Sequence, residues 1–354
     1  MKVEQLFIAG LGAFLPPPVS VREAVADGRY DAQEAEETQL ESVLVAGHES
    51  PPDMAVQAAR GALAHSGLDP EEIKLVLHAS IYFQGIDLYS TASYIHQAAL
   101  GPHSALALEV KGASNGGMAS LELAAFYLST WPERAAALVT TADKFRPPLL
   151  DRWRCDTGLV LADGATAMLL SRRKGFARVL SVATVSDPTL ERLHRGRSPF
   201  GQVPGPIDVH QRKREYLKDV GLQDMLRRFR AGLRGAVINA LRDARTELRD
   251  IARFVVPHVG RVLLEREYFA ALEIPEAMTT WPWGRRLGHL GAGDQLAGLG
   301  HLVETRTLRP GERCLLMGVG AGFTWTCAVV ELLEYPSAPN TQFSLDEGQT
   351  HDHR

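Results

Sequence analysis

The chain has 354 residues, of which 45% are apolar and 23% charged, with a formal net charge of −4 at pH 7. That length and apolar content support two core-bearing domains or one large duplicated domain, and they exclude a disordered chain. The negative net charge and the isoelectric point of about 6.3 argue against general nucleic-acid binding.

Apolar strands and helices alternate along the first half of the chain. Strands are expected at residues 5–10, 73–79, 105–110, 135–142 and 157–171, and helices at 54–65, 90–100 and 118–128. The acidic segment at 31–37 is expected to be either a solvated helix face or a mobile loop. This alternation predicts a layered α/β fold.

The second half of the chain repeats the pattern of the first. A strand is expected at 177–185, a polar insert at 186–218, a helix within 225–252, a strand ending in a loop at 254–258 and a closing hairpin at 311–330. Two halves of similar length indicate an internal duplication. We therefore expect an N-terminal half at 1–172, a C-terminal half at 173–333 and a disordered polar tail at 334–354.

The cysteines and the apolar runs bear on compartment and metals. Cys155, Cys314 and Cys327 have no spacing typical of a metal site, and their odd number gives no disulfide framework. We expect a reducing, cytoplasmic setting. No uninterrupted apolar run approaches the ~20 residues of a transmembrane helix, so no membrane association is expected. His351 and His353 are read as tail residues rather than metal ligands.

Ser114 lies between a predicted strand and a predicted helix. At the start of a helix, the free backbone N–H groups and the positive end of the helix dipole favour a developing negative charge. A small hydroxyl at that place is a candidate nucleophile. The alternative is that Ser114 only caps the helix and that the glycines beside it only form a tight turn.

Five short segments, spread in order over nearly the whole chain, carry a family pattern. They are Ala113-Ser-Asn-Gly116, Ala162-Asp-Gly-Ala165, Val256-Pro-His258, Gly288-His289 and Gly318-Val-Gly-Ala-Gly-Phe-Thr-Trp325. In these segments the chain resembles the thiolase-fold condensing enzymes, closest to ketoacyl-ACP synthase type III. The resemblance implies a duplicated five-layer αβαβα fold, with the nucleophile in the first half and the catalytic histidines in the second.

The family normally carries Cys, His and Asn in its site, and Ser114, His258 and His289 stand at the corresponding positions here. A serine hydroxyl is a weak nucleophile that needs an adjacent base. Asp294 follows His289 by five residues across a glycine-rich turn. If Asp294 accepts a hydrogen bond from one imidazole nitrogen, the other nitrogen can take the Ser114 proton. This pattern resembles that of the condensing-enzyme-like acyltransferases of natural-product pathways.

The resemblance implies further roles for these residues and leaves alternatives open. The backbone N–H groups of Ser114 and Ala321 would form the oxyanion hole. His258 and His289 would together stabilise an enolate if the site works like related condensing enzymes that use a Cys and two His. Alternatively, His258 is a satisfied core histidine, and Asp294 only caps the helix that follows it.

We therefore predict an acyltransferase of secondary metabolism, such as polyketide or antibiotic biosynthesis. An acyl group would move from an acyl-ACP or acyl-CoA thioester, through an acyl-Ser114 intermediate, to a hydroxyl, an amine or a carrier thiol. The alternatives are a decarboxylating or chain-priming ketosynthase and a non-catalytic subunit that binds an active condensing enzyme. The thioester is already activated, so no metal or organic cofactor is expected.

Four stretches bear on the partners. Residues 38–46 and 259–261 lack the groups usual in family members that accept coenzyme A, which favours an acyl carrier protein as donor. Basic clusters at 211–214 and 227–234 suit such an acidic partner, the alternative being solvated helix faces. The resemblance also implies a homodimer paired through the edge strand before the nucleophile turn.

Residues 81–89 mix aromatic and apolar side chains and are predicted to form part of the pocket wall. The alternative for this segment is a plain connection between a strand and a loop.

Overall fold

A computed structural model describes residues 1–132, 134–201, 205–336 and 342–344. At its centre is a nine-stranded sheet in the order β5-β4-β6-β7-β1-β8-β11-β10-β9, and β2 and β3 form a separate pair. The strands are β1 (Phe7–Phe14), β2 (Pro18–Ser20), β3 (Ser42–Leu44), β4 (Ile73–Ala79), β5 (Leu106–Val110), β6 (Ala136–Asp143), β7 (Gly164–Ser171), β8 (Ala177–Ser186), β9 (Ile251–Val255), β10 (Arg313–Gly320) and β11 (Thr324–Leu332).

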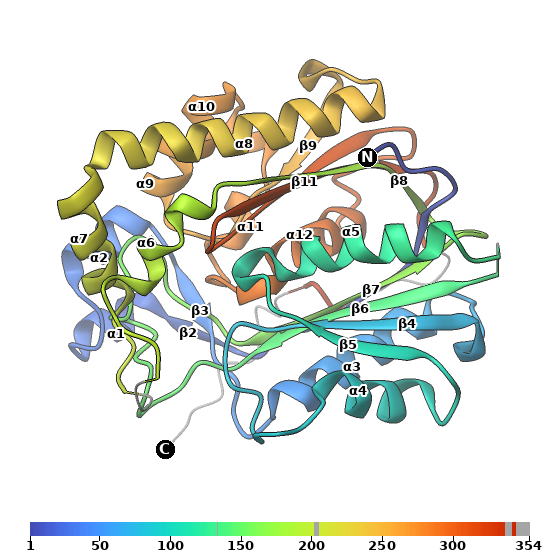
Figure 1. The fold of residues 1–354 in the computed structure, drawn as a ribbon, viewed down its shortest axis with the longest axis horizontal. Coiled ribbons are helices and arrows are strands. Elements are labelled where there is room, and N and C mark those ends of the chain that lie inside the picture. Colours follow the sequence, from blue (N-terminus) through green and yellow to red (C-terminus); the bar gives the residue numbers. More distant parts are fainter. Residues whose placement is uncertain (133, 202–204, 337–341, 345–354) are drawn as a thin grey trace.

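The nine strands fold into two stacked halves, as Figure 1 shows. The first half is β5-β4-β6-β7-β1 and the second is β8-β11-β10-β9. A short antiparallel pairing joins them, in which Phe7 and Ile8 of β1 lie opposite Arg178 and Ala177 of β8. Strands β6 and β7 are buried along their whole length, as expected where helices cover both faces of a sheet.

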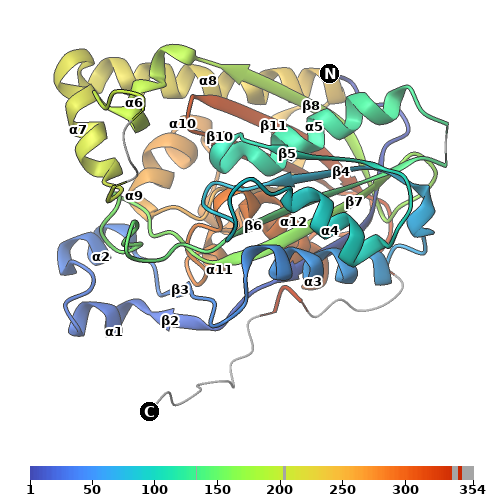
Figure 2. The same ribbon diagram turned by 60° about the horizontal axis from the view of Figure 1, so that its bottom comes forward.

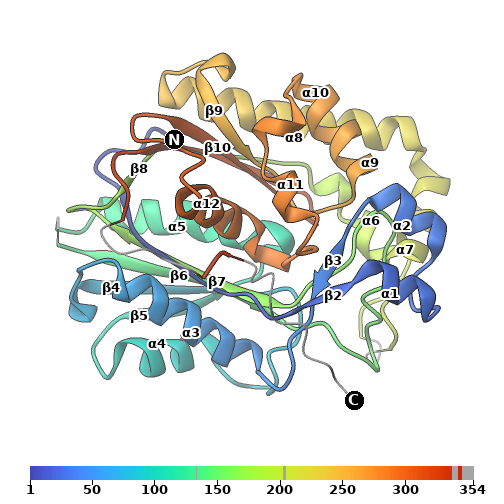
Figure 3. The same ribbon diagram turned by 180° about the vertical axis from the view of Figure 1, so that it is seen from behind.

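Helices form the other three layers. Figures 1 and 3 show α3 and α4 on the outer face of the first half, α8 on the outer face of the second, and α5 with α12 between the halves. This order of layers confirms the predicted five-layer αβαβα fold. The helices are α1 (Val21–Ala26), α2 (Ala32–Thr38), α3 (Pro51–Ala64), α4 (Thr91–Leu100), α5 (Gly116–Ser129), α6 (Arg192–Arg195), α7 (Val209–Val220), α8 (Leu222–Ala244), α9 (Arg261–Leu264), α10 (Ala270–Leu272), α11 (Trp281–Gly284) and α12 (Asp294–Glu304).

Segments distant in the sequence meet at one end of the molecule. In Figures 1, 2 and 3, α1 and α2 lie near α6 and α7, with the β2-β3 pair beside them. Parts of the first and second halves therefore share this end. Across the described ranges, no helix combines the length and the apolar character needed to cross a membrane.

Several predicted boundaries differ from the structure. The strand expected at 157–171 begins only at Gly164, because the chain before it turns to pair Leu161 with His289. The helix expected within 225–252 ends at Ala244, because Arg245 takes a left-handed φ of 52°, and β9 begins at Ile251. The polar insert at 186–218 contains α6 and most of α7, and the acidic segment at 31–37 belongs to helix α2.

The C-terminal tail corrects one prediction. Residues 337–341 and 345–354, which include His351 and His353, lie outside the described residues. Phe343 is only 1% exposed and packs beside Gly300, where an added Cβ atom would lie 2.3 Å from its ring. The expectation of a disordered tail is wrong at residues 342–344, because burial of one aromatic ring contributes enough apolar contact to fix the segment.

Candidate active site

Ser114 lies in a short 3-10 turn, Ala113–Asn115, between β5 and α5. Ala113 has a left-handed φ of 47°, which alanine rarely adopts. The side-chain amide of Asn115 fixes the turn to β11 by donating to the hydroxyls of Thr324 at 3.0 Å and Thr326 at 2.7 Å. The strained turn thus holds Ser114 at the N-terminal end of α5, where the helix dipole favours an oxyanion.

Two glycines let this turn approach the second half of the chain closely. A Cβ atom at Gly117 would lie 2.4 Å from the carbonyl oxygen of Ala292, and one at Gly320 would lie 2.3 Å from the carbonyl oxygen of Gly112. Only a residue without a side chain fits at either place. The start of α5 therefore packs directly on the turn between His289 and α12, and on the end of β10.

Ser114, His289 and Asp294 form a continuous hydrogen-bonded series. The Ser114 Oγ atom lies 2.8 Å from His289 Nε2, and His289 Nδ1 lies 2.6 Å from Asp294 Oδ2. The backbone N–H of Leu290 donates to Asp294 Oδ1 at 2.8 Å. Neither Ser114 nor Asp294 acts as a side-chain helix cap, so the capping alternatives do not describe these side chains. The arrangement can move a proton from a serine hydroxyl to a histidine.

The electrostatics of this series favour an ionised Asp294 and a basic His289. Burial raises the pKa of Asp294, but the imidazoles of His289 and His258 outweigh it and hold that pKa below its usual value. Burial lowers the pKa of His289, but the Asp294 carboxylate and its hydrogen bond outweigh that effect, so the pKa of His289 is raised. A histidine with a raised pKa is a stronger base toward Ser114.

His258 lies behind Asp294 rather than at the nucleophile. Its side chain is fully buried, and its Nδ1 atom lies 3.3 Å from Asp294 Oδ1, while its backbone N–H donates to Asp294 Oδ2 at 2.8 Å. The ring meets Trp283 edge-on, with centroids 5.4 Å apart. Burial lowers the pKa of His258, which favours the neutral ring. The structure thus brings together three of the four predicted catalytic side chains and separates His258 from Ser114.

Ala321 lies at the turn between β10 and β11 and lines the same cavity as Ser114. Among the described residues, its backbone N–H has no backbone hydrogen-bond partner. A free N–H beside the nucleophile is what an oxyanion hole requires. Ala321 therefore stays a candidate for that role together with Ser114.

A cavity of about 470 Å³ extends from Ser114 and His289. Its walls come from α2, α6, α7, α8, the segment from Pro257 to Tyr268 and the β10-β11 hairpin. Among its lining residues, Glu37, Arg214, Leu222 and Val262 are exposed and mark the mouth. The volume suits a small organic group.

One predicted part of the cavity wall is wrong. None of residues 81–89 lines the cavity, although they were expected to. The polar insert supplies wall residues instead, among them Leu193, His194, His210 and Lys213. The signal available in the sequence was the length of this insert between two strands, since long connections are often functional.

Comparison with known proteins defines the family. Residues 108–188 match the model of 3-oxoacyl-[acyl-carrier-protein] synthase III, and residues 241–332 match the model of its C-terminal part. The β-ketoacyl-[acyl-carrier-protein] synthase III of Clostridium beijerinckii is 21% identical over 92% of this chain and 98% of its own length. The 3-oxopimeloyl-[acyl-carrier-protein] synthase of Rhodothermus marinus is 29% identical over 82% of each chain.

Solved structures agree with this match. ChlB3, described as an acyltransferase, is 38% identical, with a TM-score of 0.90 over 94% of this chain and 98% of that chain. The 3-oxoacyl-(acyl carrier protein) synthase III of Pseudomonas aeruginosa has a TM-score of 0.75 at 22% identity, over 93% of this chain and 99% of that chain. The chain belongs to the ketoacyl-ACP synthase III family of thiolase-fold enzymes.

Proposed function

We propose that the protein is an acyltransferase that works through an acyl-Ser114 intermediate. The observation that carries this proposal is the series from Ser114 Oγ to His289 Nε2 at 2.8 Å and from His289 Nδ1 to Asp294 Oδ2 at 2.6 Å. Such a series activates a serine hydroxyl, which is otherwise too weak a nucleophile for a thioester. The likeness to ChlB3, described as an acyltransferase, supports the same reading.

The first half of the reaction transfers the acyl group to the protein. His289 Nε2 takes the Ser114 proton while Oγ attacks the thioester carbonyl, and the backbone N–H groups of Ser114 and Ala321 stabilise the oxyanion. The C–S bond then breaks, and the leaving thiolate takes the proton from His289. Asp294 stays ionised and holds the ring in the tautomer that leaves Nε2 free to accept.

The second half of the reaction regenerates the serine. His289 removes a proton from an acceptor hydroxyl, amine or carrier thiol, the acceptor attacks the Ser114 ester, and the C–O bond to Ser114 breaks. The proton on His289 then returns to Ser114. One base serves both halves, so no second histidine is needed at the nucleophile.

The position of His258 argues against decarboxylative condensation. Stabilising an enolate with two histidines requires both rings to face the same reacting group. His258 is buried behind Asp294 and does not line the cavity, and His289 Nε2 is already engaged by Ser114. The open route from the cavity to Ser114 likewise argues against a subunit without catalytic function.

Arg214 supports an acyl carrier protein as donor. It is exposed at the cavity mouth, and no described residue forms an ion pair or hydrogen bond with its side chain. Neighbouring Lys213 is bound to Asp156, and Arg227 and Arg228 are bound to Asp224. Of the predicted basic clusters, Arg214 is thus available to an acidic partner at the entrance.

The edge strand β5 supports a homodimer. Leu106 and Leu108 on β5 are 45% and 47% exposed, and Phe126 on the neighbouring helix α5 is 53% exposed. An unpaired edge strand with apolar side chains is a surface that proteins cover. A second copy of the chain pairing along β5 would cover it.

Intact mass spectrometry after incubation with acyl-pantetheine thioesters or an acyl carrier protein tests the proposed function. The wild-type protein should gain the mass of the acyl group on the peptide that contains Ser114, and Ser114→Ala should gain none. Malonyl thioesters should be transferred without release of carbon dioxide. Equal labelling of Ser114→Ala, or a β-ketoacyl product, would contradict the proposal.

A further inference from the structure

His194 and Tyr268 line the cavity, and their polar side-chain atoms have no hydrogen-bond partner among the described residues. The first is His194 on α6, whose ring meets Phe323 edge-on with centroids 5.3 Å apart. Neither ring nitrogen forms a hydrogen bond with any described residue, and neither is among the fully enclosed orphan atoms. Both nitrogens therefore remain accessible. Burial lowers the pKa of His194 to about 4, so the neutral ring offers one donor and one acceptor.

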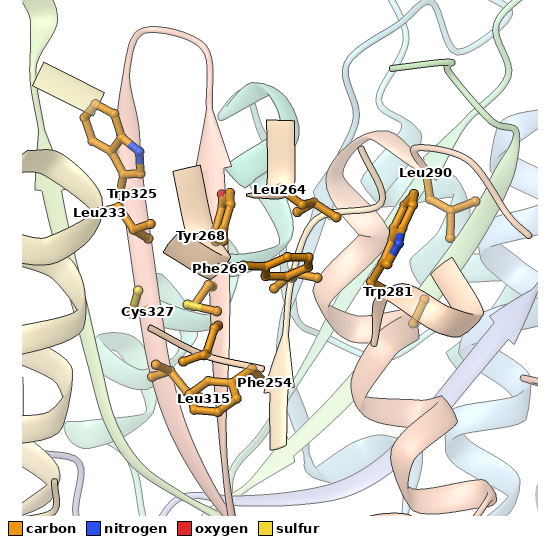
Figure 4. Close-up of a cluster of buried hydrophobic side chains, with 14 of the residues drawn as sticks. Leu233, Phe254, Leu264, Tyr268, Phe269, Trp281, Leu290, Leu315, Trp325 and Cys327 are labelled. Carbon is orange, nitrogen blue, oxygen red and sulfur yellow. The ribbon is translucent and has the colours of Figure 1, made fainter. Parts of the chain in front are cut away.

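The second is Tyr268, from the short π-helix Glu265–Phe269, and its side chain is only 5% exposed. Figure 4 shows its hydroxyl directed away from Phe254 and Leu315 in the core. This hydroxyl has no hydrogen-bond partner among the described residues, yet it is not fully enclosed. Burial raises the pKa of Tyr268, which keeps the hydroxyl protonated and able to donate.

A cluster of aromatic side chains lies beside His194 in the cavity wall. The ring of Phe229 lies 4.8 Å from that of Phe323 and 5.4 Å from that of Trp325, measured between centroids. Gly232 on α8 allows Trp325 to pack against the helix, since an added Cβ atom would lie 2.3 Å from the ring. This part of the wall is thus a packed aromatic surface next to His194.

Unpaired polar groups in such a setting need an explanation. Nearly all buried polar groups in proteins are hydrogen-bonded, and leaving one without a partner is costly. An acyl group without polar atoms would fill the cavity and shut both groups off from water. A hydroxyl on the acyl group would instead supply the missing partner.

We propose that His194 and Tyr268 bind a hydroxyl substituent of the acyl group, so that the enzyme selects hydroxylated acyl groups with an apolar body. This inference rests on the proposed function, because the acyl group occupies the cavity while it is attached to Ser114. His194 can accept from a hydroxyl and Tyr268 can donate to one. A site built to pair with a hydroxyl rejects the analogue that lacks it far better than a purely apolar site does.

Matched pairs of acyl-pantetheine thioesters test the inference. Hexanoyl is compared with 3-hydroxyhexanoyl, and benzoyl with each of the three hydroxybenzoyl isomers, by the rate of Ser114 acylation in intact mass spectra. For the wild-type protein we expect at least one hydroxylated member to react about tenfold faster or more than its plain partner. In His194→Phe and Tyr268→Phe this ratio should fall to about twofold or less, because each variant keeps the ring and removes the polar atoms.

Tyr89→Phe serves as the control, since Tyr89 is exposed and does not line the cavity. It should keep the wild-type preference. Both His194→Phe and Tyr268→Phe are used, so that if one variant misfolds the other still tests the inference. Acylation of Ser114 without a preference, or a preference that both variants retain, would overturn the inference while the proposed function stands. If none of the thioesters acylates Ser114, the proposed function fails and the inference fails with it.

Discussion

The Nδ1 atom of His289 lies 2.6 Å from Oδ2 of Asp294, and both side chains are almost wholly shielded from water. Asp294 is the first residue of α12, so its position is fixed by a helix that lies between the two halves of the nine-stranded sheet. Backbone N–H groups of His258 and Leu290 also donate to its carboxylate. The carboxylate is therefore held in one orientation before any substrate arrives, which is the preorganisation that proton transfer requires.

Asp294→Asn should abolish most of the acylation activity while keeping the fold. The amide cannot hold His289 in the tautomer that leaves Nε2 unprotonated, so the rate of Ser114 acylation should fall about 10³- to 10⁴-fold. Intact mass spectrometry over time measures this rate. The control is Asp219→Asn, which removes a surface carboxylate paired with Arg192 and Arg197 and should react at the wild-type rate. A loss below about tenfold for Asp294→Asn would remove Asp294 from the mechanism.

The acylation rate should rise with pH through the pKa of His289. Only the neutral ring can accept the Ser114 proton, and Asp294 raises the pKa of His289 above the 6.5 of an ordinary histidine. The raised pKa also contributes to the stability of the fold, and this contribution is fully present below pH 6.5 and is lost as the pH rises through the raised pKa. The acylation rate therefore rises over the pH range in which the stability falls. A pH-rate profile and melting curves from pH 5.5 to 9 measure both. In Asp294→Asn the inflection should move to lower pH, and an unmoved inflection would assign it to another group.

Much of the fold and of the site could be predicted from the sequence. The strands near 73–79 and 177–185 lie within one or two residues of β4 and β8, because both are rich in apolar and β-branched residues. Ser114, His289 and Asp294 could be picked out because motifs of the family surround them. Their contact could not be read directly, since it depends on the close backbone approach at Gly117.

Other features left no such signal. The orientation of His258 depends on space beside Trp283 and Asp294, which come from other segments of the chain. Phe343 is a single aromatic residue in a polar tail, and its burial depends on the space left at Gly300. The wall residues of 186–218 sit in a segment without clear periodicity. These features are set by tertiary packing, which local sequence patterns do not encode.

Arg214→Glu should weaken the reaction with an acyl carrier protein and leave the reaction with acyl-pantetheine unchanged. Its charge is free at the cavity mouth, so reversal should raise KM for the carrier about tenfold, with a smaller effect at high salt. Steady-state kinetics with both donors check this. Arg227→Glu is the matched control, because Arg227 is also exposed but is paired with Asp224. Equal effects of the two variants would mean that general charge, and not a docking contact, governs the reaction.

Leu106→Lys combined with Leu108→Lys should separate the proposed homodimer. Two charges on β5 would have to lose their water shell in an interface along this edge, which disfavours association. Light scattering after size-exclusion chromatography should give a dimer mass for the wild-type protein and a monomer mass for the variant. Ile238→Lys, at a 62% exposed site on α8, should remain dimeric. A monomeric wild-type protein at micromolar concentration would contradict the proposed homodimer.

His258→Leu should reduce activity and stability moderately, because His258 positions Asp294 and does not touch the reacting atoms. Its backbone N–H to Asp294 remains in the variant, while the imidazole contact at 3.3 Å is lost. We expect acylation to slow about tenfold and the free energy of unfolding to fall by about 1–3 kcal/mol, as for a change in a buried polar contact. Acylation kinetics and urea denaturation measure the two effects.

His289→Ala is the comparison for this prediction, since it removes the base itself and should slow acylation about 10³-fold or more. The pH-rate profile separates the two histidines further. His258 touches neither Ser114 nor the thioester. The dependence of the acylation rate on the pKa of His289 should therefore persist in His258→Leu, with a shifted midpoint. If His258→Leu were as inactive as His289→Ala and had no pH inflection, His258 would have to be a catalytic residue that moves into the cavity during the reaction.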